Sequence, residues 1–120
     1  MAKAKLIVIA VENKPGTVAA AIASLSAAGI NILSIFGWTQ ATQGNLQLVV
    51  DNPRKAMKTL AAAAVAHSEA KAEVVELPNK PGSLHAYLQK LSKKGINLRS
   101  ICATSSKSAR KSVIVWTADN

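Results

Sequence analysis

The sequence predicts an α+β protein built from two similar units, because one motif occurs twice within the same succession of elements. Residues 13–17 read Asn-Lys-Pro-Gly-Thr. A helical pattern follows them, and after it residues 29–32 read Gly-Ile-Asn-Ile. Residues 79–83 and 95–98 repeat both stretches as Asn-Lys-Pro-Gly-Ser and Gly-Ile-Asn-Leu, at an offset of 79 − 13 = 66 residues. We expect this offset throughout, since internal repeats dictate the architecture of a chain.

The first repeat begins with a strand and a helix. Residues 5–11 are almost wholly apolar and rich in β-branched side chains, which is typical of a strand buried on both faces. The Asn-Lys-Pro-Gly turn ends this strand. Val18, Ile22 and Leu25 then recur along one face of a helix, and Gly29 follows that helix as a C-terminal cap.

A hairpin and a second helix complete the first repeat. Residues 30–38 and 45–51 predict two strands joined by a polar turn at 40–44. Asn52 is placed to cap the next helix, and the alanine-rich run 56–66 consists mostly of the best helix-forming residue.

The second repeat follows the same order but ends earlier. Residues 70–77 predict a strand, Leu84, Leu88 and Leu91 form one helical face, and residues 96–104 and 112–117 predict a hairpin. No segment remains for a second helix.

The element order βαββα, then βαββ, predicts two ferredoxin-like units with an antiparallel sheet and helices on one face. The units are residues 1–69 and the shortened 70–120, with the strand at 70–77 shared between them. We expect one sheet in which the second, third and first strands of the first repeat are followed by the first, third and second strands of the second repeat. Both faces of the first strand are apolar, so we also expect a homodimer or another partner on the open face.

Composition restricts the class of protein. Hydrophobic residues make up 49% of 120 residues, enough for a core, and no apolar run reaches the ~20 residues of a membrane span. Cys102 is the only cysteine, which excludes an intrachain disulfide and fits a reducing cytoplasm. The net charge is +9, and residues 77–118 contain no carboxylate. A solvated surface explains this charge more simply than nucleic-acid binding.

The chain lacks the residue patterns of catalysis. His67 and His85 are isolated, without cysteine or carboxylate at ligand spacing, so we expect no metal and no cofactor. Cys102 has no evident histidine partner, and no catalytic triad or phosphate-binding glycine loop is present. We therefore expect a protein that is not an enzyme.

The repeated turn, helix and Gly-Ile-Asn stretch resembles the ACT domain, in two copies covering nearly the whole chain. ACT domains are small regulatory domains that commonly bind amino acids where two domains meet. The resemblance implies contacts from the turn after the first strand and from the start of the second strand. The corresponding residues here are Asn13, Pro15, Gly16, Thr17, Asn31, Ile32, Asn79, Pro81, Gly82, Ser83, Asn97 and Leu98.

The chemistry of these residues suits a zwitterion. Asparagine side chains offer acceptors for an ammonium group and donors for a carboxylate. A helix N-terminus adds free N–H groups and the positive end of the helix dipole. A purely structural interpretation remains open, in which Asn13 and Asn79 close turns while Asn31 and Asn97 tie each helix end to a strand.

These observations lead to an amino-acid-binding regulatory protein that modulates metabolism allosterically, through a partner such as a biosynthetic enzyme or by dimerisation. Two alternatives stay open. One is a ferredoxin-like nucleic-acid-binding protein, although Phe36, Trp38, Tyr87 and Trp116 are too scattered for the usual aromatic platform. The other is a regulatory interaction module that needs no ligand.

Overall fold

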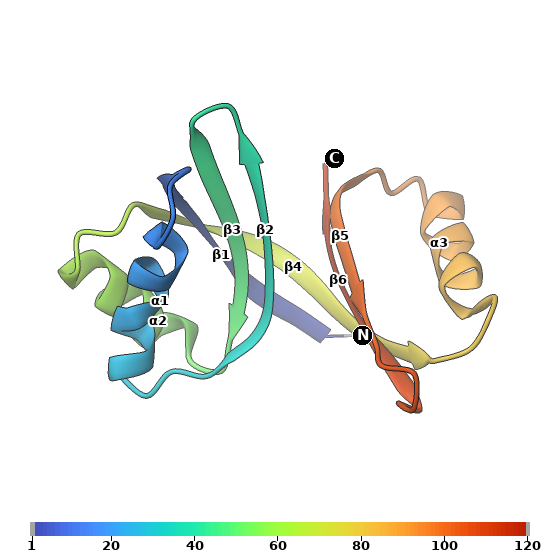
Figure 1. The fold of residues 1–120 in the computed structure, drawn as a ribbon. Helices are drawn as coiled ribbons and strands as arrows, with labels where there is room; N and C mark the ends of the chain where they lie inside the picture. The colour runs from blue at the N-terminus through green and yellow to red at the C-terminus, as the bar shows by residue number, and fades with distance from the viewer. Residues whose placement is uncertain (1, 120) are drawn as a thin grey trace. The chain divides into compact units, whose positions relative to one another are not determined.

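The computed structural model describes residues 2–119, and its strands and helices follow one another in the order that the sequence predicts (Figure 1). In chain order the elements are β1 (Ala2–Glu12), α1 (Thr17–Ala27), β2 (Ile32–Gln40), β3 (Gln43–Val50), α2 (Pro53–Ala62), β4 (His67–Pro78), α3 (Ser83–Lys93), β5 (Leu98–Thr104) and β6 (Lys111–Ala118).

The chain divides into two compact units. The N-terminal unit is Lys5–Ala70, and the C-terminal unit combines Met1–Ala4 with Lys71–Asn120. The boundary falls inside β1 and inside β4, so each of these strands contributes residues to both units.

The N-terminal unit is an antiparallel sheet with the strand order β2-β3-β1-β4, and α1 and α2 lie on one of its faces (Figure 1). Register pairs such as Ile9 with Leu46 and Ile35 with Leu48 align the apolar residues of neighbouring strands. This order and the α+β class confirm the ferredoxin-like fold expected from the sequence.

The core of this unit fills the space between the sheet and the two helices. Odd-numbered residues of β1 and even-numbered residues of β3 point to the same face, where they meet α1 and α2. The fully or almost fully buried members are Ile7, Ile9, Ala21, Leu25, Ile30, Leu46, Leu48, Val50, Ala56 and Leu60.

The ends of both helices have local causes. Gly16 precedes α1 with φ 85°, a left-handed conformation that glycine adopts without a Cβ penalty. The Asn52 side chain accepts a hydrogen bond from the Lys55 N–H at 3.2 Å, which confirms it as the cap of α2. However, α2 ends at Ala62 and does not use all of the 56–66 run. Ala64 turns left-handed with φ 57°, and Val65 N–H closes on the Leu60 carbonyl at 3.0 Å.

The C-terminal unit repeats this arrangement with α3 over β4, β6 and β5, and it takes Ala2–Ala4 of β1 as the strand beside β4. Its core gathers Tyr87, Leu91, Ile114 and Trp116. The Trp116 Nε1–H donates to the Tyr87 hydroxyl at 2.7 Å, so the indole and phenol satisfy each other inside the core.

The expectation of one constant offset is wrong for the last strand of each repeat. Ile9 pairs with Leu46, and its counterpart Val75 pairs with Ile114. The offset is therefore 75 − 9 = 66 in the first strand but 114 − 46 = 68 in the third. The connection between β5 and β6 accommodates two more residues than the connection between β2 and β3.

None of the helices within residues 2–119 has the length and apolar character needed to cross a membrane.

Candidate functional site

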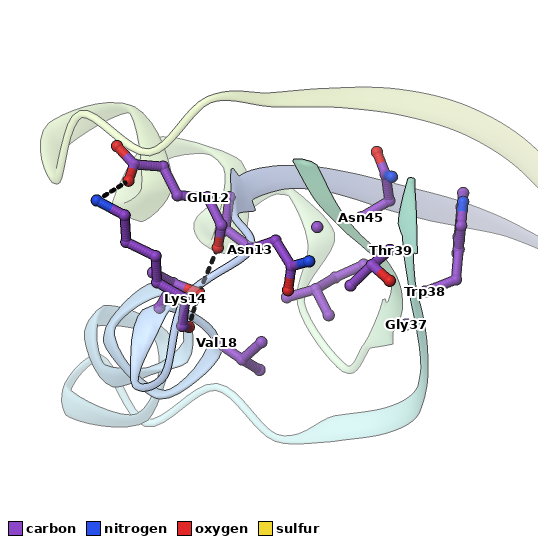
Figure 2. Close-up of a pocket in the computed structure, with 12 residues that line it drawn as sticks. Glu12, Asn13, Lys14, Val18, Gly37, Trp38, Thr39 and Asn45 are labelled. Atoms are coloured by element: carbon purple, nitrogen blue, oxygen red, sulfur yellow. Dashed lines mark hydrogen bonds and ion pairs between the residues drawn. The ribbon is translucent and has the colours of Figure 1, made fainter. Parts of the chain in front are cut away.

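A pocket of about 210 Å³ lies in the N-terminal unit, between the start of α1 and the strand ends near the β2–β3 hairpin (Figure 2). The strands contribute Val11, Glu12, Gly37, Trp38, Thr39, Gly44, Asn45 and Leu46. The turn and the first residues of α1 contribute Asn13, Lys14, Thr17 and Val18. This volume lies below the roughly 300–1,000 Å³ of pockets for drug-sized ligands, so it suits a smaller molecule.

Two glycines line the pocket, and the residues paired with them on the neighbouring strands carry larger side chains. Gly44 is paired with Val11 on one side and Thr39 on the other, and Gly37 is paired with Leu46. Paired residues share a face of the sheet, so both glycines lie on the helix-covered face. A Cβ at Gly37 would lie 2.9 Å from Leu46 Cδ2, and one at Gly44 would lie 3.0 Å from Val11 Cγ2. The absence of a Cβ at both positions therefore lets the side chains of Leu46 and Val11 lie close against the neighbouring strand.

The opposite wall is the beginning of α1. Val18 extends from the helix toward the strands and remains 44% exposed (Figure 2). The backbone N–H groups of Val18 and Ala19 donate to no group in the described part of the chain, as is usual in a first helical turn. No side chain caps this end, and no acidic residue stands in its first turn. Val18 lines the pocket and Ala19 follows it in the helix, so the unused donors and the positive end of the helix dipole lie at or next to the pocket wall.

Hydrogen bonds hold the turn before α1 in place. The Thr17 hydroxyl lies 2.7 Å from the Glu12 carbonyl oxygen and 2.9 Å from that of Lys14. The Asn13 N–H donates to the Thr42 carbonyl at 2.9 Å, and Asn13 Nδ2 donates to the Ala41 carbonyl at 3.3 Å. Asn13 therefore connects the turn to the hairpin, while its Oδ1 atom remains available as an acceptor.

The charged residues beside the pocket neutralise each other. Lys14 Nζ lies 2.9 Å from Glu12 Oε2, and both side chains are about 70% exposed. Figure 2 shows this pair on the side of the turn away from Gly37 and Trp38. The other residues that line the cavity are apolar or uncharged.

The structure separates the residues predicted for one site. Asn13 and Thr17 line the pocket, whereas Pro15 and Gly16 belong to the same turn without lining it. Asn31 and Ile32 stand at the start of β2, nine residues long, and the pocket lies at its other end. At ~3.3 Å per residue, the 37 − 31 = 6 residues between them place Asn31 about 20 Å from Gly37, the first pocket residue of β2. There the Asn31 N–H donates to Asp51 Oδ1 at 3.1 Å, and its carbonyl accepts from the Asp51 N–H.

The predicted residues of the second repeat divide in the same way. Asn79 Nδ2 donates to the Ser106 carbonyl at 2.9 Å and to the Ala109 carbonyl at 2.8 Å. Pro81, Gly82 and Ser83 complete that turn and begin α3. Asn97 and Leu98 lie at the opposite end of the unit, where the Asn97 carbonyl accepts from the Asp119 N–H at 2.7 Å.

Comparison with known proteins identifies the family. The model of the ACT domain pair matches residues 1–120. The chain belongs to the ACT domain pair family. No curated protein sequence matches it.

Solved structures share the fold of this ACT pair. Protein BT0572 from Bacteroides thetaiotaomicron is 26% identical with a TM-score of 0.91, covering 98% of this chain and 81% of that one. The ligand-free regulatory subunit of aspartate kinase from Thermus thermophilus is 19% identical with a TM-score of 0.69, covering 95% and 83%. Aspartate kinase from Clostridium acetobutylicum is 17% identical with a TM-score of 0.57, covering 98% and 30%.

Sequence reasoning missed most of the pocket in this ACT pair, including Val11, Gly37, Thr39, Gly44 and Leu46. The two glycines carried a usable indication, because an isolated glycine inside a strand pattern often marks a close approach of another group. The other three residues looked like ordinary strand residues, and only the register shows which of them face α1.

Proposed function

We propose that this ACT pair is a regulatory protein that binds a small amino acid in the pocket of its N-terminal unit. The observation that carries the proposal is the combination of an apolar cavity with unused backbone donors at the start of α1. Both features are needed to hold a molecule with a charged end and a side chain.

The amino acid would bind with its carboxylate toward the Val18 and Ala19 N–H groups, where the helix dipole favours negative charge. Its ammonium group would meet neutral acceptors, for which Asn13 Oδ1 and the Thr39 hydroxyl are available. Its side chain would enter the space beside Gly37. Asn31, Asn97 and the other residues at the far ends of the units would contact this ligand only through another copy or partner.

The regulated partner in this proposal is an enzyme of amino-acid biosynthesis. The fold-level likeness to a regulatory subunit of aspartate kinase supports a separate enzyme as the target. Within residues 2–119, no group of three histidine, cysteine or acidic residues is arranged to hold a metal ion. Asn13 already connects the turn to the β2–β3 hairpin. Binding of the ligand would hold these two segments together more firmly and would thereby alter the surface offered to the partner.

A homodimer through β2 completes the proposal. β2 is an edge strand of its sheet, and its sequence Ile-Leu-Ser-Ile-Phe-Gly-Trp-Thr-Gln contains no charge. Leu33, Ile35, Phe36 and Trp38 are exposed by 61, 46, 43 and 38%, respectively. Edge strands of monomeric proteins usually carry charges or proline that prevent pairing. A second copy is the occupant favoured here, because an uncharged edge can pair with its own copy about a twofold axis.

Isothermal titration with each of the twenty amino acids tests the binding proposal. We expect at least one to bind, and we expect Thr39→Val to weaken that binding by about tenfold because an acceptor for the ammonium is lost. Thr42→Val is the matched control, since Thr42 lies in the hairpin but does not line the pocket. Absence of heat with all twenty would reject amino-acid binding and favour a ligand-independent module.

The nucleic-acid alternative gains no support from the aromatic residues. Tyr87 and Trp116 are buried in the core of the C-terminal unit and bonded to each other, so they offer no base-stacking surface. Phe36 and Trp38 stack at 5.6 Å between ring centroids, but they lie on the uncharged strand β2. Oligonucleotide binding with a steep salt dependence would restore this alternative.

A further inference from the structure

We propose that only the N-terminal unit keeps the ligand space, that Gly37 and Gly44 determine its specificity for short uncharged side chains, and that the chain binds one amino acid. This inference rests on the proposed function and specifies which copy performs it and for which class of ligand.

The register identifies the counterpart of each pocket residue. In the C-terminal unit Ala103 pairs with Ile114 as Gly37 pairs with Leu46. Ser112 pairs with Leu77 as Gly44 pairs with Val11. An alignment at a constant offset would instead match Gly44 with Arg110, so the equivalence becomes visible only from the strand pairing.

Four positions of the pocket carry larger side chains in the second copy. Leu77 replaces Val11, Leu84 replaces Val18, Ala103 replaces Gly37 and Ser112 replaces Gly44. Every replacement is larger. Leu77 packs against the core of its unit, and Ser112 Oγ lies 3.5 Å from the Leu77 carbonyl oxygen. We infer that these four changes, all toward larger side chains, reduce the space for a ligand at the corresponding position of the C-terminal unit.

The two glycines control the space through their neighbours. A Cβ at position 37 or 44 would contact the end of Leu46 or Val11 at about 3 Å, closer than ordinary packing allows. Both neighbours line the pocket. The Leu46 contact is to the end of a flexible side chain, whereas Val11 is β-branched and has less freedom to move. A methyl group at either glycine would therefore displace its neighbour and change the volume left for a ligand.

The walls define the class of side chain. Val11, Val18 and Leu46 are aliphatic. Glu12 and Lys14 form an ion pair with each other, with 2.9 Å between Glu12 Oε2 and Lys14 Nζ. A charged ligand side chain would have to separate Lys14 from Glu12, the two charged residues of the lining, in order to gain a partner of opposite charge. The volume of about 210 Å³ is smaller than that of pockets for drug-sized ligands, which limits the length of the ligand. L-alanine, L-valine and L-leucine are thus favoured over L-aspartate and L-lysine.

The test is titration calorimetry of the full chain with these five amino acids. We expect binding of at least one aliphatic member with one site per chain, and at least tenfold weaker binding of L-aspartate and L-lysine. Two sites per chain, or preference for a charged member, would overturn the inference while leaving the proposed function intact. Binding of none of the twenty amino acids would instead reject the proposed function itself.

Exchanging residues between the copies provides matched variants. Gly37→Ala with Gly44→Ser, which reproduces the second copy, should weaken binding at least tenfold and more for L-leucine than for L-alanine. Ala103→Gly with Ser112→Gly makes the opposite change in the C-terminal unit and should leave the affinity within about twofold. An equal effect of both pairs would contradict the assignment. The wild-type stoichiometry decides the question even if the first pair fails to fold.

Discussion

At the scale of single residues, the repeated asparagine has a structural task that both copies share. Asn13 and Asn79 follow the first strand of their repeat, and each donates through Nδ2 to carbonyl groups of the hairpin beside it. The bonds differ in quality. Asn13 makes one at 3.3 Å, whereas Asn79 makes two, at 2.9 and 2.8 Å. Repetition of this residue therefore follows partly from the fold, and a ligand role is an additional use of the same side chain.

We expect Asn79→Ala to lower the free energy of unfolding by about 1–2 kcal/mol, because two carbonyl groups lose their donor. Asn13→Ala should cost less, about 0.5–1 kcal/mol, since its single bond is longer and exposed. Urea denaturation followed by circular dichroism measures both. An equal or larger cost for Asn13→Ala would show that the hairpin bonds do not determine the difference.

At the scale of secondary-structure elements, helix ends depend on few atoms. The Asn52 side chain satisfies the Lys55 N–H at the start of α2, and Pro53 follows it at the first helical position, where its missing N–H has no cost. α1 begins without any side-chain cap. The start of α2 is thus fixed by its own sequence, while no side chain accepts a hydrogen bond from the first amides of α1.

Replacing the cap tests this contrast. Asn52→Ala should destabilise the protein by about 1 kcal/mol, whereas Asn52→Asp should retain most of the stability because its carboxylate accepts the same hydrogen bond. Thermal or urea unfolding of both variants gives the measurement. If the two variants lose equal stability, the Lys55 bond is not what holds the start of α2.

Sequence reasoning was reliable where one short stretch determines the outcome. Local patterns predicted the asparagine cap of α2 and the glycine after α1. The order of elements along each repeat predicted the strand order of each unit. The pocket was not predictable, because it depends on which residues of three strands pair, and that register is fixed by contacts distant in sequence. The two-residue shift in the second hairpin is an example, since the constant offset of the motif conceals it.

At the scale of the whole molecule, the net charge opposes association of two copies, whereas exposed apolar surface favours it. A chain with net charge +9 repels its own copies, whereas the uncharged strand β2 offers an edge for pairing. A surface with little charge of its own, such as β2, adds least to this repulsion when two chains meet.

We therefore expect Ile35→Lys to weaken homodimerisation at least tenfold, measured by sedimentation equilibrium, and we expect added salt to tighten the wild-type dimer by screening repulsion. Ile101→Lys is the matched control because Ile101 occupies the equivalent position in β5 and is similarly exposed, 38% against 46%. A monomeric wild type, or an equal effect of both substitutions, would contradict dimerisation through β2.

The division of β1 and β4 between the two units has a consequence for dissecting the protein. A gene split at the repeat boundary, between codons 70 and 71, would interrupt β4 and leave its first residues on one fragment and the rest on the other. The same fragment would carry away Ala2–Ala4, which belong to the other unit. Two co-expressed halves would each lack part of a strand and should recover their structure only by complementing one another. The duplication is therefore readable in the sequence, but it does not mark a place where the chain can be divided.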